Sequence, residues 1–526
     1  MKILVCDGLE KTGVEILAAL ENVTVDERPN IKPGEIAEII GDYDGLIVRS
    51  KTQVTRELIE RAAKMRVIGR AGTGVDNIDV AAATRRGIVV MNAAAGNTVT
   101  TAEHTWAMLM ALARRIPQAV ASTKSGKWEK NKFLGVELLS KTLGIIGLGR
   151  IGSTVANRAR AFGMTVLAFD PYFTKEAARE LGIEMSTLDE IYARADFITL
   201  HTPLTEETRG IINAASIARM KDGVRIINCA RGGLVDELAL AEAVQAGKVA
   251  GAALDVFEQE PINADNPLLA LDKVICTPHL GASTQEAQLG VATIIAEQVS
   301  DYLQSGAVRG AVNMPAVSAE LMAVIGPYIT LGEKLGSFQG QVFGHDLQEV
   351  EIEYSGDVAD YDVKPITQAI LAGFLSPVIT RVNMVNAALV AEERGIKVRE
   401  SLSRKARDFA SMIRVRAVTT KQESEVAGAL FGRSDARIVR VNGFNLEAIP
   451  RGVILFLFNR DVPGVLGNIA SYIGSQNINI GRLYLGRKVV GENALALIQI
   501  DEAMSEAQLS GLEALPNVIS VQQVKL

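Results

Sequence analysis

Short apolar runs alternate with helical patterns through the first 92 residues of the chain. The stretches at 10–20, 55–65 and 75–87 carry apolar residues at helical spacing. The runs between them are rich in valine and isoleucine, and they lie at 2–7, 45–50, 66–72 and 87–92. Strand, helix and strand at this rhythm predict a parallel sheet with helices on its faces.

A second alternation of the same kind begins near Lys141. Its apolar runs lie at 141–146, 165–170, 197–203, 224–230, 249–257 and 273–279. Most of these runs end at a polar or glycine-rich turn. Because ligands of open α/β sheets bind at the carboxyl ends of the strands, we expect the chemistry of this protein at these turns.

The segment between the two alternations, 100–120, predicts one long helix. Thr101 and Glu103 suit its start, and Pro117 lies near its far end. The segment has more apolar residues than one core-facing side of a helix needs. Burial in an oligomer interface and simple core packing are the two alternatives. His104 in this segment is expected to be structural, since no partner acid is evident from the sequence.

The composition changes after about Asn313. Residues 313–447 mix helix and strand patterns without a catalytic motif, and His345 among them is expected to be structural. Residues 452–526 follow the order strand, helix, strand, strand, helix, strand, which predicts a ferredoxin-like α+β unit. The fold class is therefore two Rossmann-like parallel-sheet units, then an α+β unit, then a ferredoxin-like unit.

Composition and charge exclude several classes of function. The net charge of −6 comes from interspersed acids and bases, which argues against nucleic-acid and membrane-surface binding. No apolar run approaches the ~20 residues of a membrane span, and the N-terminal run is too short for a signal peptide. Three cysteines without metal-type spacing and only four histidines argue against a metal site and fit a reducing cytoplasm.

The sequence "GLGRIG", residues 147–152, follows a predicted strand and opens a predicted helix. Gly147 permits a tight turn, Gly149 lets the backbone approach a pyrophosphate, and Gly152 allows close helix packing. The helix N-terminus would add N–H groups and a partial positive charge. Asp170 ends the next strand, where its carboxylate would bind ribose hydroxyls and repel a 2′-phosphate, so NAD is predicted over NADP.

Three charged or titratable residues follow consecutive strands of the second alternation: Arg231, Glu260 and His279. A histidine can take the proton of an alcohol, and a carboxylate on its other ring nitrogen fixes the tautomer. A guanidinium can bind a carboxylate at two points and polarise a carbonyl. Together these needs predict oxidation of a 2-hydroxy acid. Glu258 is an alternative partner for His279, and a structural salt bridge is the alternative for Arg231.

Five motifs make the chain resemble the D-isomer-specific 2-hydroxyacid dehydrogenases: "GRAGTGVDNIDV", "GLGRIG", "NCARGGLVDE", "ALDVFEQEP" and "TPHLGAST". They cover residues 1–313, and the tail resembles that of the long-chain branch that oxidises 3-phosphoglycerate. The resemblance implies catalytic roles for Arg231, Glu260 and His279. It also implies that Asp255 holds the nicotinamide carboxamide. The full set of implied NAD contacts is Thr73, Gly147, Gly149, Arg150, Ile151, Gly152, Asp170, Thr202, Cys229, Ala230, Arg231, Asp255, His279, Leu280, Gly281 and Ala282.

The resemblance further implies how the chain divides. A discontinuous substrate-binding domain would comprise residues 1–96 and 285–312, with an NAD-binding domain of residues 97–284 inserted. Residues 313–447 would form an allosteric substrate-binding, or intervening, domain, and residues 452–526 an ACT regulatory domain. The helix from Thr100 resembles the dimer-forming helix of the family, whose usual state is a homotetramer.

The implied substrate, 3-phosphoglycerate, carries a carboxylate and a phosphate, and its oxidation gives 3-phosphohydroxypyruvate. Arg49 and Arg70 both follow predicted strands, where they would bind the phosphate. The turn with Gly72 and Thr73 offers N–H donors for the carboxylate, helped by Asn97. A surface salt bridge is the alternative for either arginine.

The segment "NRDVPGVLGNIA", residues 459–470, resembles the ligand turn of ACT domains. There a small amino acid binds at a domain interface, and the resemblance implies L-serine as a feedback inhibitor. Asn459, Asp461 and Asn479 would contact it. The alternative is a dimerisation module without ligand.

Two other functions fit the same fold. One is a glyoxylate or hydroxypyruvate reductase of the same family, which usually lacks the long tail. The other is a non-catalytic, NADH-sensing protein like the corepressors that share this fold. Reduction of 2-oxoglutarate as a side activity is also compatible with the sequence.

Overall fold

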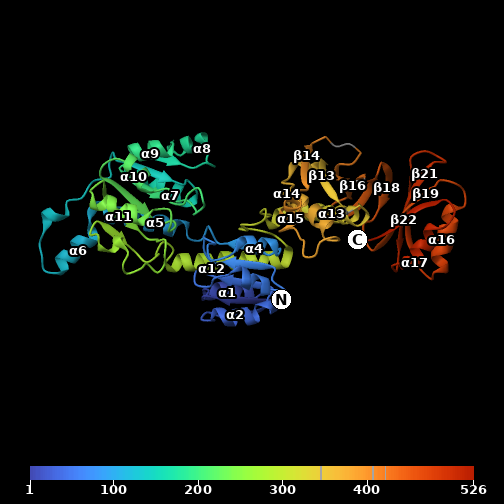
Figure 1. Ribbon diagram of the computed structural model, residues 1–526, viewed down its shortest axis with the longest axis horizontal. Helices are drawn as coiled ribbons and strands as arrows, with labels where there is room; N and C mark the ends of the chain where they lie inside the picture. The colour runs from blue at the N-terminus through green and yellow to red at the C-terminus, as the bar shows by residue number, and fades with distance from the viewer. Residues whose placement is uncertain (344–345, 406–407, 421) are drawn as a thin grey trace.

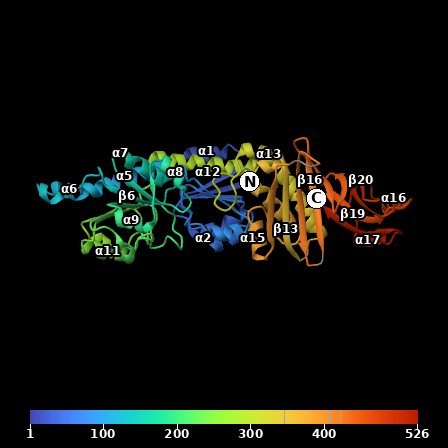
Figure 2. The ribbon, with the colours of Figure 1, turned by 90° about the horizontal axis from the view of Figure 1, so that it is seen from above.

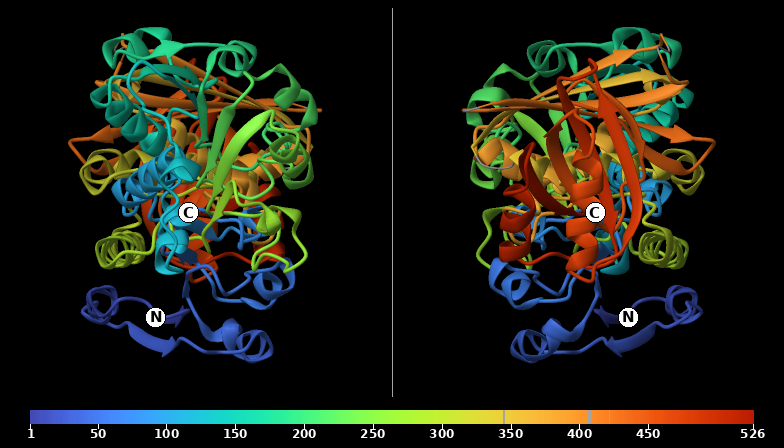
Figure 3. Two further views of the ribbon diagram at one scale, coloured as in Figure 1. Left: turned by 90° about the vertical axis from the view of Figure 1, so that its left-hand side faces the viewer. Right: turned by 90° about the vertical axis from the view of Figure 1, so that its right-hand side faces the viewer.

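The computed structural model contains four β-sheets in an elongated molecule, in which the unit of the first sheet lies between the units of the second and the third (Figure 1). It describes residues 1–343, 346–405, 408–420 and 422–526, so His345 lies outside the described residues. Seen from above, the units lie in a row from helix α6 to strand β20 (Figure 2). Viewed along the long axis, the N-terminal sheet projects to one side of the other units (Figure 3).

The first sheet has five parallel strands in the order β2-β1-β3-β4-β5. The strands are β1 (Lys2–Cys6), β2 (Thr24–Arg28), β3 (Gly45–Val48), β4 (Val67–Arg70) and β5 (Val89–Asn92). Its helices are α1 (Lys11–Ala18), α2 (Pro33–Ile39), α3 (Arg56–Arg61) and α4 (Val80–Arg85). Strand β2 was not predicted, because this edge strand is polar and half-exposed and so lacks an apolar run.

Helix α12 (Gln285–Ser305) returns to this first sheet from far along the chain. Val291, Ile295 and Val299 of α12 share one core with Ile3 and Val67. The two parts of the chain therefore bury apolar surface against each other, although more than 200 residues separate them.

The second sheet has seven parallel strands in the order β12-β11-β10-β9-β6-β7-β8. The strands are β6 (Thr142–Ile146), β7 (Thr165–Phe169), β8 (Glu184–Met185), β9 (Phe197–Leu200), β10 (Val224–Asn228), β11 (Val249–Leu254) and β12 (Val274–Cys276). Its helices are α7 (Arg150–Ala161), α8 (Lys175–Glu180), α9 (Leu188–Arg194), α10 (Ala214–Arg219) and α11 (Glu237–Gln245). The strand order reverses between β6 and β9, which creates the crevice where such sheets bind ligands.

The predicted single helix at 100–120 is wrong, because the chain forms two helices there. Helix α5 (Thr98–Arg114) ends at Arg115, which adopts a left-handed conformation with φ 55°, and α6 (Ile116–Lys124) begins directly after it. Pro117 lies in the first turn of α6, where its missing N–H costs no hydrogen bond. Trp106, Met108 and Leu109 are buried in the core of the second sheet, so core packing explains most of the apolar excess.

The third sheet has six strands in the order β14-β13-β15-β16-β17-β18. They are β13 (Leu347–Gly356), β14 (Lys397–Ser403), β15 (Ser411–Thr419), β16 (Glu423–Phe431), β17 (Asp435–Val441) and β18 (Phe444–Ala448). Strands β13 and β14 are parallel and the other pairs are antiparallel. Helices α13 (Ala319–Phe343), α14 (Lys364–Leu375) and α15 (Ala387–Glu393) accompany this sheet.

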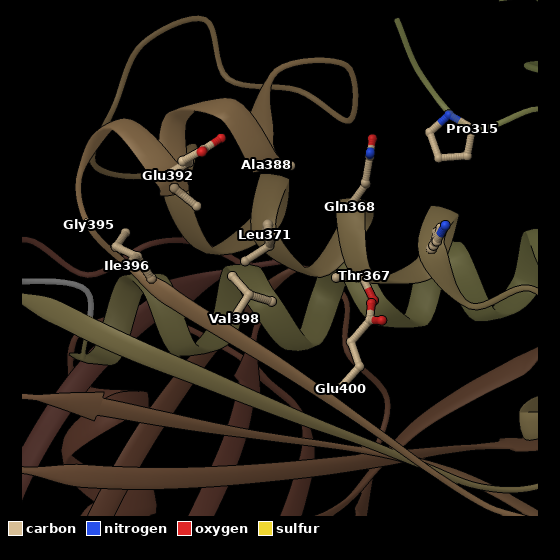
Figure 4. Close-up of a pocket in the computed structure, with 12 residues that line it drawn as sticks. Pro315, Thr367, Gln368, Leu371, Ala388, Glu392, Gly395, Ile396, Val398 and Glu400 are labelled. Carbon is tan, nitrogen blue, oxygen red and sulfur yellow. The ribbon is translucent and has the colours of Figure 1, made fainter. Parts of the chain in front are cut away.

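An open cavity of about 590 Å³ lies between α14, α15 and β14 (Figure 4). Leu371, Ile396 and Val398 form its apolar lining, and Gln368 and Glu400 add polar groups. Beside it, the Nδ2 atom of Asn386 donates to the carbonyl of Arg85, which links α15 to the first sheet's unit. The cavity is thus separate from the strand ends of the two parallel sheets.

The fourth sheet is antiparallel, with the order β20-β21-β19-β22. Its elements are β19 (Val453–Arg460), α16 (Val465–Ser475), β20 (Ile480–Arg487), β21 (Asn493–Ile500), α17 (Glu506–Glu513) and β22 (Val518–Lys525). This is the ferredoxin-like order expected from the sequence. The four sheets together confirm the predicted fold class. No described helix is both long and apolar enough to cross a membrane.

Candidate active site

The three predicted catalytic residues lie at the carboxyl ends of three adjacent strands. Arg231 follows β10, Glu260 follows β11 and His279 follows β12. The Nδ1 atom of His279 donates to Glu260 Oε2 at 2.7 Å, whereas no hydrogen bond joins Glu258 to this histidine in the described residues. The Nε2 atom of His279 has no partner in the described part of the chain, and half of the side chain is exposed. This nitrogen is therefore free to take a proton from a ligand in the crevice.

The electrostatics of this pair suit a proton acceptor with a fixed tautomer. Burial raises the pKa of Glu260, but the hydrogen bond and charge of His279 and the backbone N–H of Phe257 outweigh it, so the pKa lies below its usual value. Glu260 is thus ionised at neutral pH and accepts the Nδ1 proton. The proton-accepting lone pair of His279 is then on Nε2.

Asp255 organises the turn that carries His279. It is fully buried, its Oδ1 accepts from Thr277 Oγ1 at 2.6 Å and from Leu280 N at 2.8 Å, and its Oδ2 accepts from Gly281 N at 2.8 Å. Its backbone carbonyl accepts from His279 N, and His279 itself adopts a positive φ of 55°. Asp255 therefore maintains an unusual backbone conformation at a functional residue. Its contact with nicotinamide stays a prediction.

His104 has an acidic partner that the sequence did not reveal. Its Nε2 lies 3.1 Å from Asp255 Oδ1, although the two residues are far apart along the chain. Burial raises the pKa of Asp255, but the hydrogen bonds from His104, Thr277 and Leu280 N lower it by more, so the pKa lies below its usual value. Asp255 is therefore ionised. His104 is thus part of the network beneath the His279 turn.

Arg231 contacts a residue that the sequence reasoning missed. Its Nε donates to Asp76 Oδ2 at 2.9 Å, and its Nη1 donates to the carbonyl of Ala230 at 2.6 Å. Asp76 belongs to the first sheet's unit, so this ion pair bridges the two parallel-sheet units. Asp76 lies within the quoted motif "GRAGTGVDNIDV", which is the one signal that could have singled it out.

The predicted substrate residues lie on the facing edge of the first sheet. Arg49 follows β3 and Arg70 ends β4. The Oγ1 atom of Thr73 donates to Asn97 Oδ1 at 2.6 Å, beside the turn that contains Gly72. Within the described ranges neither arginine forms an ion pair, so the salt-bridge alternative for both is wrong.

Arg70 is a half-buried cation that forms no ion pair within the described residues. Its Nε is buried and has no hydrogen-bond partner among the described residues. Burial lowers the pKa of Arg70 to about 10, and the positive charges of Arg231 and Arg49 add to this effect. The charges of Asp76 and Asp7 act in the opposite direction, so the pKa of Arg70 reflects mainly its burial, and an anionic ligand would stabilise this guanidinium.

The glycine turn before α7 fits a dinucleotide. A Cβ atom at Gly152 would lie 2.1 Å from the carbonyl oxygen of Gly147, so only glycine allows this close approach. Gly149 is the N-cap of α7, and a Cβ atom there would meet no neighbouring atom of the described residues within 4 Å, which leaves the helix N-terminus open to an anion. Thr202 Oγ1 is buried and unpartnered at the same edge. These residues would hold the pyrophosphate and neighbouring groups of NAD.

The other predicted NAD contacts follow strands of the second sheet, at the same carboxyl edge. Asp170 directly follows β7 and accepts from Leu148 N at 2.8 Å, which fixes its carboxylate beside the glycines. Arg150 and Ile151 begin α7, Cys229 and Ala230 follow β10, and Leu280, Gly281 and Ala282 follow β12. No cluster of His, Cys, Asp or Glu able to hold a metal ion occurs among the described residues.

The Gly149→Ala variant is expected to fold normally but to bind NADH at least about tenfold more weakly. The added methyl group meets no protein atom but occupies the space above the helix N-terminus. Isothermal calorimetry with NADH and thermal unfolding measure both quantities. Gly34→Ala, which also meets no atom within 4 Å and lies on α2, is the matched control. Unchanged NADH affinity in Gly149→Ala would contradict this site.

The three predicted regulatory residues do not lie close together within a single copy of the chain. Asn459 is 2% exposed at the end of β19, and its Oδ1 has no partner in the described residues. Asp461 accepts from Gly491 N at 3.2 Å near the same end of the sheet. Asn479 instead donates to Asp501 Oδ2 at 3.0 Å, at the opposite end of β21 from the partner of Asn459, Ala494. Seven strand residues separate these ends by roughly 23 Å.

Two family models match this chain. Residues 106–281 match the NAD-binding domain of the D-isomer-specific 2-hydroxyacid dehydrogenases. Residues 324–442 match the D-3-phosphoglycerate dehydrogenase intervening domain. The predicted cofactor, NAD, is thereby confirmed.

Known proteins of this kind are similar over the whole chain. D-3-phosphoglycerate dehydrogenase of Methanocaldococcus jannaschii is 44% identical, with 100% of each chain covered. The enzyme of the same name from Synechocystis is 43% identical over 100% of this chain and 95% of its own. Among solved structures, a D-lactate dehydrogenase of Aquifex aeolicus with NAD and lactic acid is 30% identical, with a TM-score of 0.53 over 60% of this chain and 100% of its own. The chain belongs to the D-isomer-specific 2-hydroxyacid dehydrogenase family, in its D-3-phosphoglycerate dehydrogenase branch, and is an NAD-dependent dehydrogenase.

Proposed function

We propose that this protein oxidises D-3-phosphoglycerate to 3-phosphohydroxypyruvate, the first step of the phosphorylated route to L-serine. The observation that carries the proposal is the placement of Arg49 and Arg70 at strand ends of the first sheet's unit, which the Arg231–Asp76 ion pair joins to the edge that carries the His279–Glu260 pair. A simple hydroxy acid offers one carboxylate to a guanidinium, whereas a phosphorylated acid adds a phosphate, which guanidinium groups also bind strongly. The relatives that extend over the entire chain, tail included, carry the same name.

The reacting end of the substrate would lie between Arg231 and His279. The Nε2 atom of His279 takes the proton of the C2 hydroxyl, and the carboxylate of Glu260 stabilises the imidazolium that forms. Arg231 binds the substrate carboxylate and polarises the C2 oxygen through its Nη1 and Nη2 edge. NAD, when bound, accepts the hydride from C2.

The phosphate end would lie against the first sheet. Arg70 supplies a desolvated cation, and Arg49 supplies a second from the neighbouring strand end. The N–H groups of the Gly72–Thr73 turn and the amide of Asn97 would contact the carboxylate end, and the hydrogen bond from Thr73 to Asn97 keeps these two residues together. This arrangement separates the two anionic ends of one small substrate.

A steady-state assay tests the proposal. NADH formation with 3-phosphoglycerate and NAD should exceed that with D-glycerate, and it should exceed the reverse rates with glyoxylate and 2-oxoglutarate. Preference for glyoxylate would favour the reductase alternative. No turnover with any of these acids, together with intact NADH binding, would favour the non-catalytic alternative.

We further propose that L-serine binds the fourth-sheet unit and inhibits the enzyme. The unpartnered Oδ1 of the buried Asn459 needs a hydrogen-bond donor, which an ammonium or hydroxyl group supplies. Because Asn479 lies at the other end of the sheet, a site with both asparagines would need a second copy of the chain. This supports a site at an interface.

Calorimetry with L-serine is expected to show binding by the unmodified enzyme and at least about tenfold weaker binding by Asn459→Ala. The variant loses the buried carbonyl that the ligand satisfies. Asn468→Ala, which alters an exposed asparagine on α16, should bind normally. No heat with the unmodified enzyme, together with unchanged rates, rejects serine regulation.

We propose a homo-oligomer, with a tetramer as the expected size. The support is a group of exposed apolar side chains on and after α6: Ile116, Val120, Trp128, Leu134 and Leu139. Light scattering of the purified chain tests this. We place the enzyme in the cytoplasm, since Cys6, Cys229 and Cys276 are unpaired.

A further inference from the structure

One turn of the first sheet's unit, residues 72–77, contacts both Arg231 and the loop that carries Arg49. We propose that its last two residues are positioning residues with separate tasks. Asp76 would act on the carboxylate end of the substrate through Arg231. Asn77 would act on the phosphate end through the loop of Arg49. This inference rests on the proposed function, because it assigns the two residues to the two anionic ends of that substrate.

Asp76 orients Arg231 without blocking it. The carboxylate accepts from Nε, and one Nη1 proton goes to the carbonyl of Ala230. A guanidinium has five N–H groups, and its outer edge presents one from Nη1 and one from Nη2, so two parallel donors remain for a ligand. Asp76 therefore fixes the plane and direction of the fork that would bind the substrate carboxylate.

The guanidinium of Arg231 also packs against the turn at Gly74. A Cβ atom at Gly74 would lie 1.9 Å from Nη2 of Arg231 and 2.6 Å from Oδ2 of Asp76. The guanidinium thus lies directly against the turn backbone. The side chain of Asp76 is 64% exposed, so the pair contributes little to folding stability, and orientation is its main effect.

Asn77 shapes the loop that carries Arg49. Its Nδ2 donates to the carbonyl of Arg49 at 2.8 Å and to that of Thr52 at 2.7 Å. Asp7 holds the same loop from the other side, where its Oδ2 accepts from the backbone N–H of Arg49 at 2.9 Å. The backbone of Arg49 is therefore fixed at both its N–H and its carbonyl, while its guanidinium has only a weak contact of 3.5 Å with Gly8.

The two contacts predict different losses of specificity. The carboxylate is common to 3-phosphoglycerate and D-glycerate, whereas the phosphate is present only in the first. A variant that disturbs Arg231 should lose activity on both acids. A variant that disturbs the Arg49 loop should lose activity on the phosphorylated acid alone.

The experiment compares kcat/KM of Asp76→Ala, Asp76→Asn and Asn77→Ala with both acids, with Arg49→Ala as the reference for loss of the phosphate contact. Asp76→Ala should lower kcat/KM roughly 10–100-fold for both acids alike, because a misplaced clamp affects turnover as well as binding. Asp76→Asn should recover part of this loss, since its amide oxygen still accepts the Nε proton. Where D-glycerate turns over too slowly, its competitive inhibition constant replaces kcat/KM.

Asn77→Ala and Arg49→Ala should each lower kcat/KM for 3-phosphoglycerate at least about tenfold and raise its KM, with little change for D-glycerate. NADH affinity should be unchanged in every variant. If Asn77→Ala does not fold, Asn77→Asp replaces the donor by an acceptor and should give the same selective loss. A selective loss in Asp76→Ala, an equal loss in Asn77→Ala, or no loss in either overturns the inference.

Failure of the proposed function would be recognised separately. If the unmodified enzyme shows no preference for 3-phosphoglycerate over D-glycerate, the proposed substrate is wrong whatever the variants do. If it shows that preference and the variants do not divide as described, only the positioning roles are wrong.

Discussion

His279→Gln is expected to lower kcat for 3-phosphoglycerate oxidation by about 10²–10⁴-fold, with NADH affinity unchanged. The glutamine side chain can still accept a hydrogen bond, but its amide cannot carry the proton that leaves the C2 hydroxyl. The imidazole lies at the end of β12, with Nδ1 bound to Glu260 and Nε2 free of partners in the described residues. Steady-state rates and NADH calorimetry measure the two quantities.

A neighbouring pair of glutamates provides the matched control for this site. Glu260→Gln should also lower kcat. The neutral amide holds the Nδ1–H tautomer of His279 less firmly than a carboxylate does, and it does not stabilise the imidazolium. Glu258→Gln, two residues away and not bonded to His279 in the described residues, should keep near-normal activity. A His279→Gln enzyme with near-normal turnover would contradict the assigned proton acceptor.

The pH behaviour of the Glu260 contact follows from the direction of its pKa shift. The pKa in the folded protein lies below the ordinary value. The stabilising effect of this contact is therefore complete above the ordinary pKa and is lost as pH falls through the lowered pKa. We expect the pair to be intact throughout the neutral and alkaline range in which the oxidation is assayed.

Arg231→Lys is expected to lower kcat/KM by about 10²–10³-fold while NADH affinity stays normal. Lysine keeps the positive charge, but it loses the planar fork and the Nε donor to Asp76. The lysine would still attract the substrate carboxylate, but it would not hold the C2 hydroxyl group in position for oxidation. Both quantities come from steady-state kinetics and calorimetry.

A surface arginine of the same sheet unit serves as the comparison. Arg219→Lys changes a residue on α10 that pairs with Asp189, and kcat/KM should not change. Near-normal turnover of Arg231→Lys would mean that charge alone is sufficient and that the two-point clamp is not used.

Much of the fold and of the reacting centre could be predicted from the chain. Alternation of apolar runs and helical patterns depends on local periodicity, so the two parallel sheets and the ferredoxin-like unit were predicted correctly. Residues that follow adjacent parallel strands must lie at one edge, which is why Arg231, Glu260 and His279 come together. Gly147 has a positive φ of 96°, and a Cβ at Gly152 would lie 2.1 Å from the Gly147 carbonyl oxygen, so the backbone requires glycine at both positions, whereas Gly149 leaves the start of α7 open.

Other features depended on contacts between distant segments. The break at Arg115 requires a left-handed residue that no motif marked. Asp76 and Arg231, and likewise His104 and Asp255, are paired only because separate units or elements face each other across the fold. Asn459 and Asn479 share a motif-based role, yet strand direction places them at opposite ends of one sheet.

The physical distinction is one of range. Periodicity and turn glycines act between neighbours in the chain, so the amino-acid sequence determines most of the helices and strands and the glycine turn before α7, and it places Arg231, Glu260 and His279 after consecutive strands. Side-chain partners across the interface of two sheets depend on how those sheets are placed relative to each other. The tertiary structure alone therefore decided which acid holds Arg231, which residue holds the loop of Arg49, and which histidine lies beneath the His279 turn.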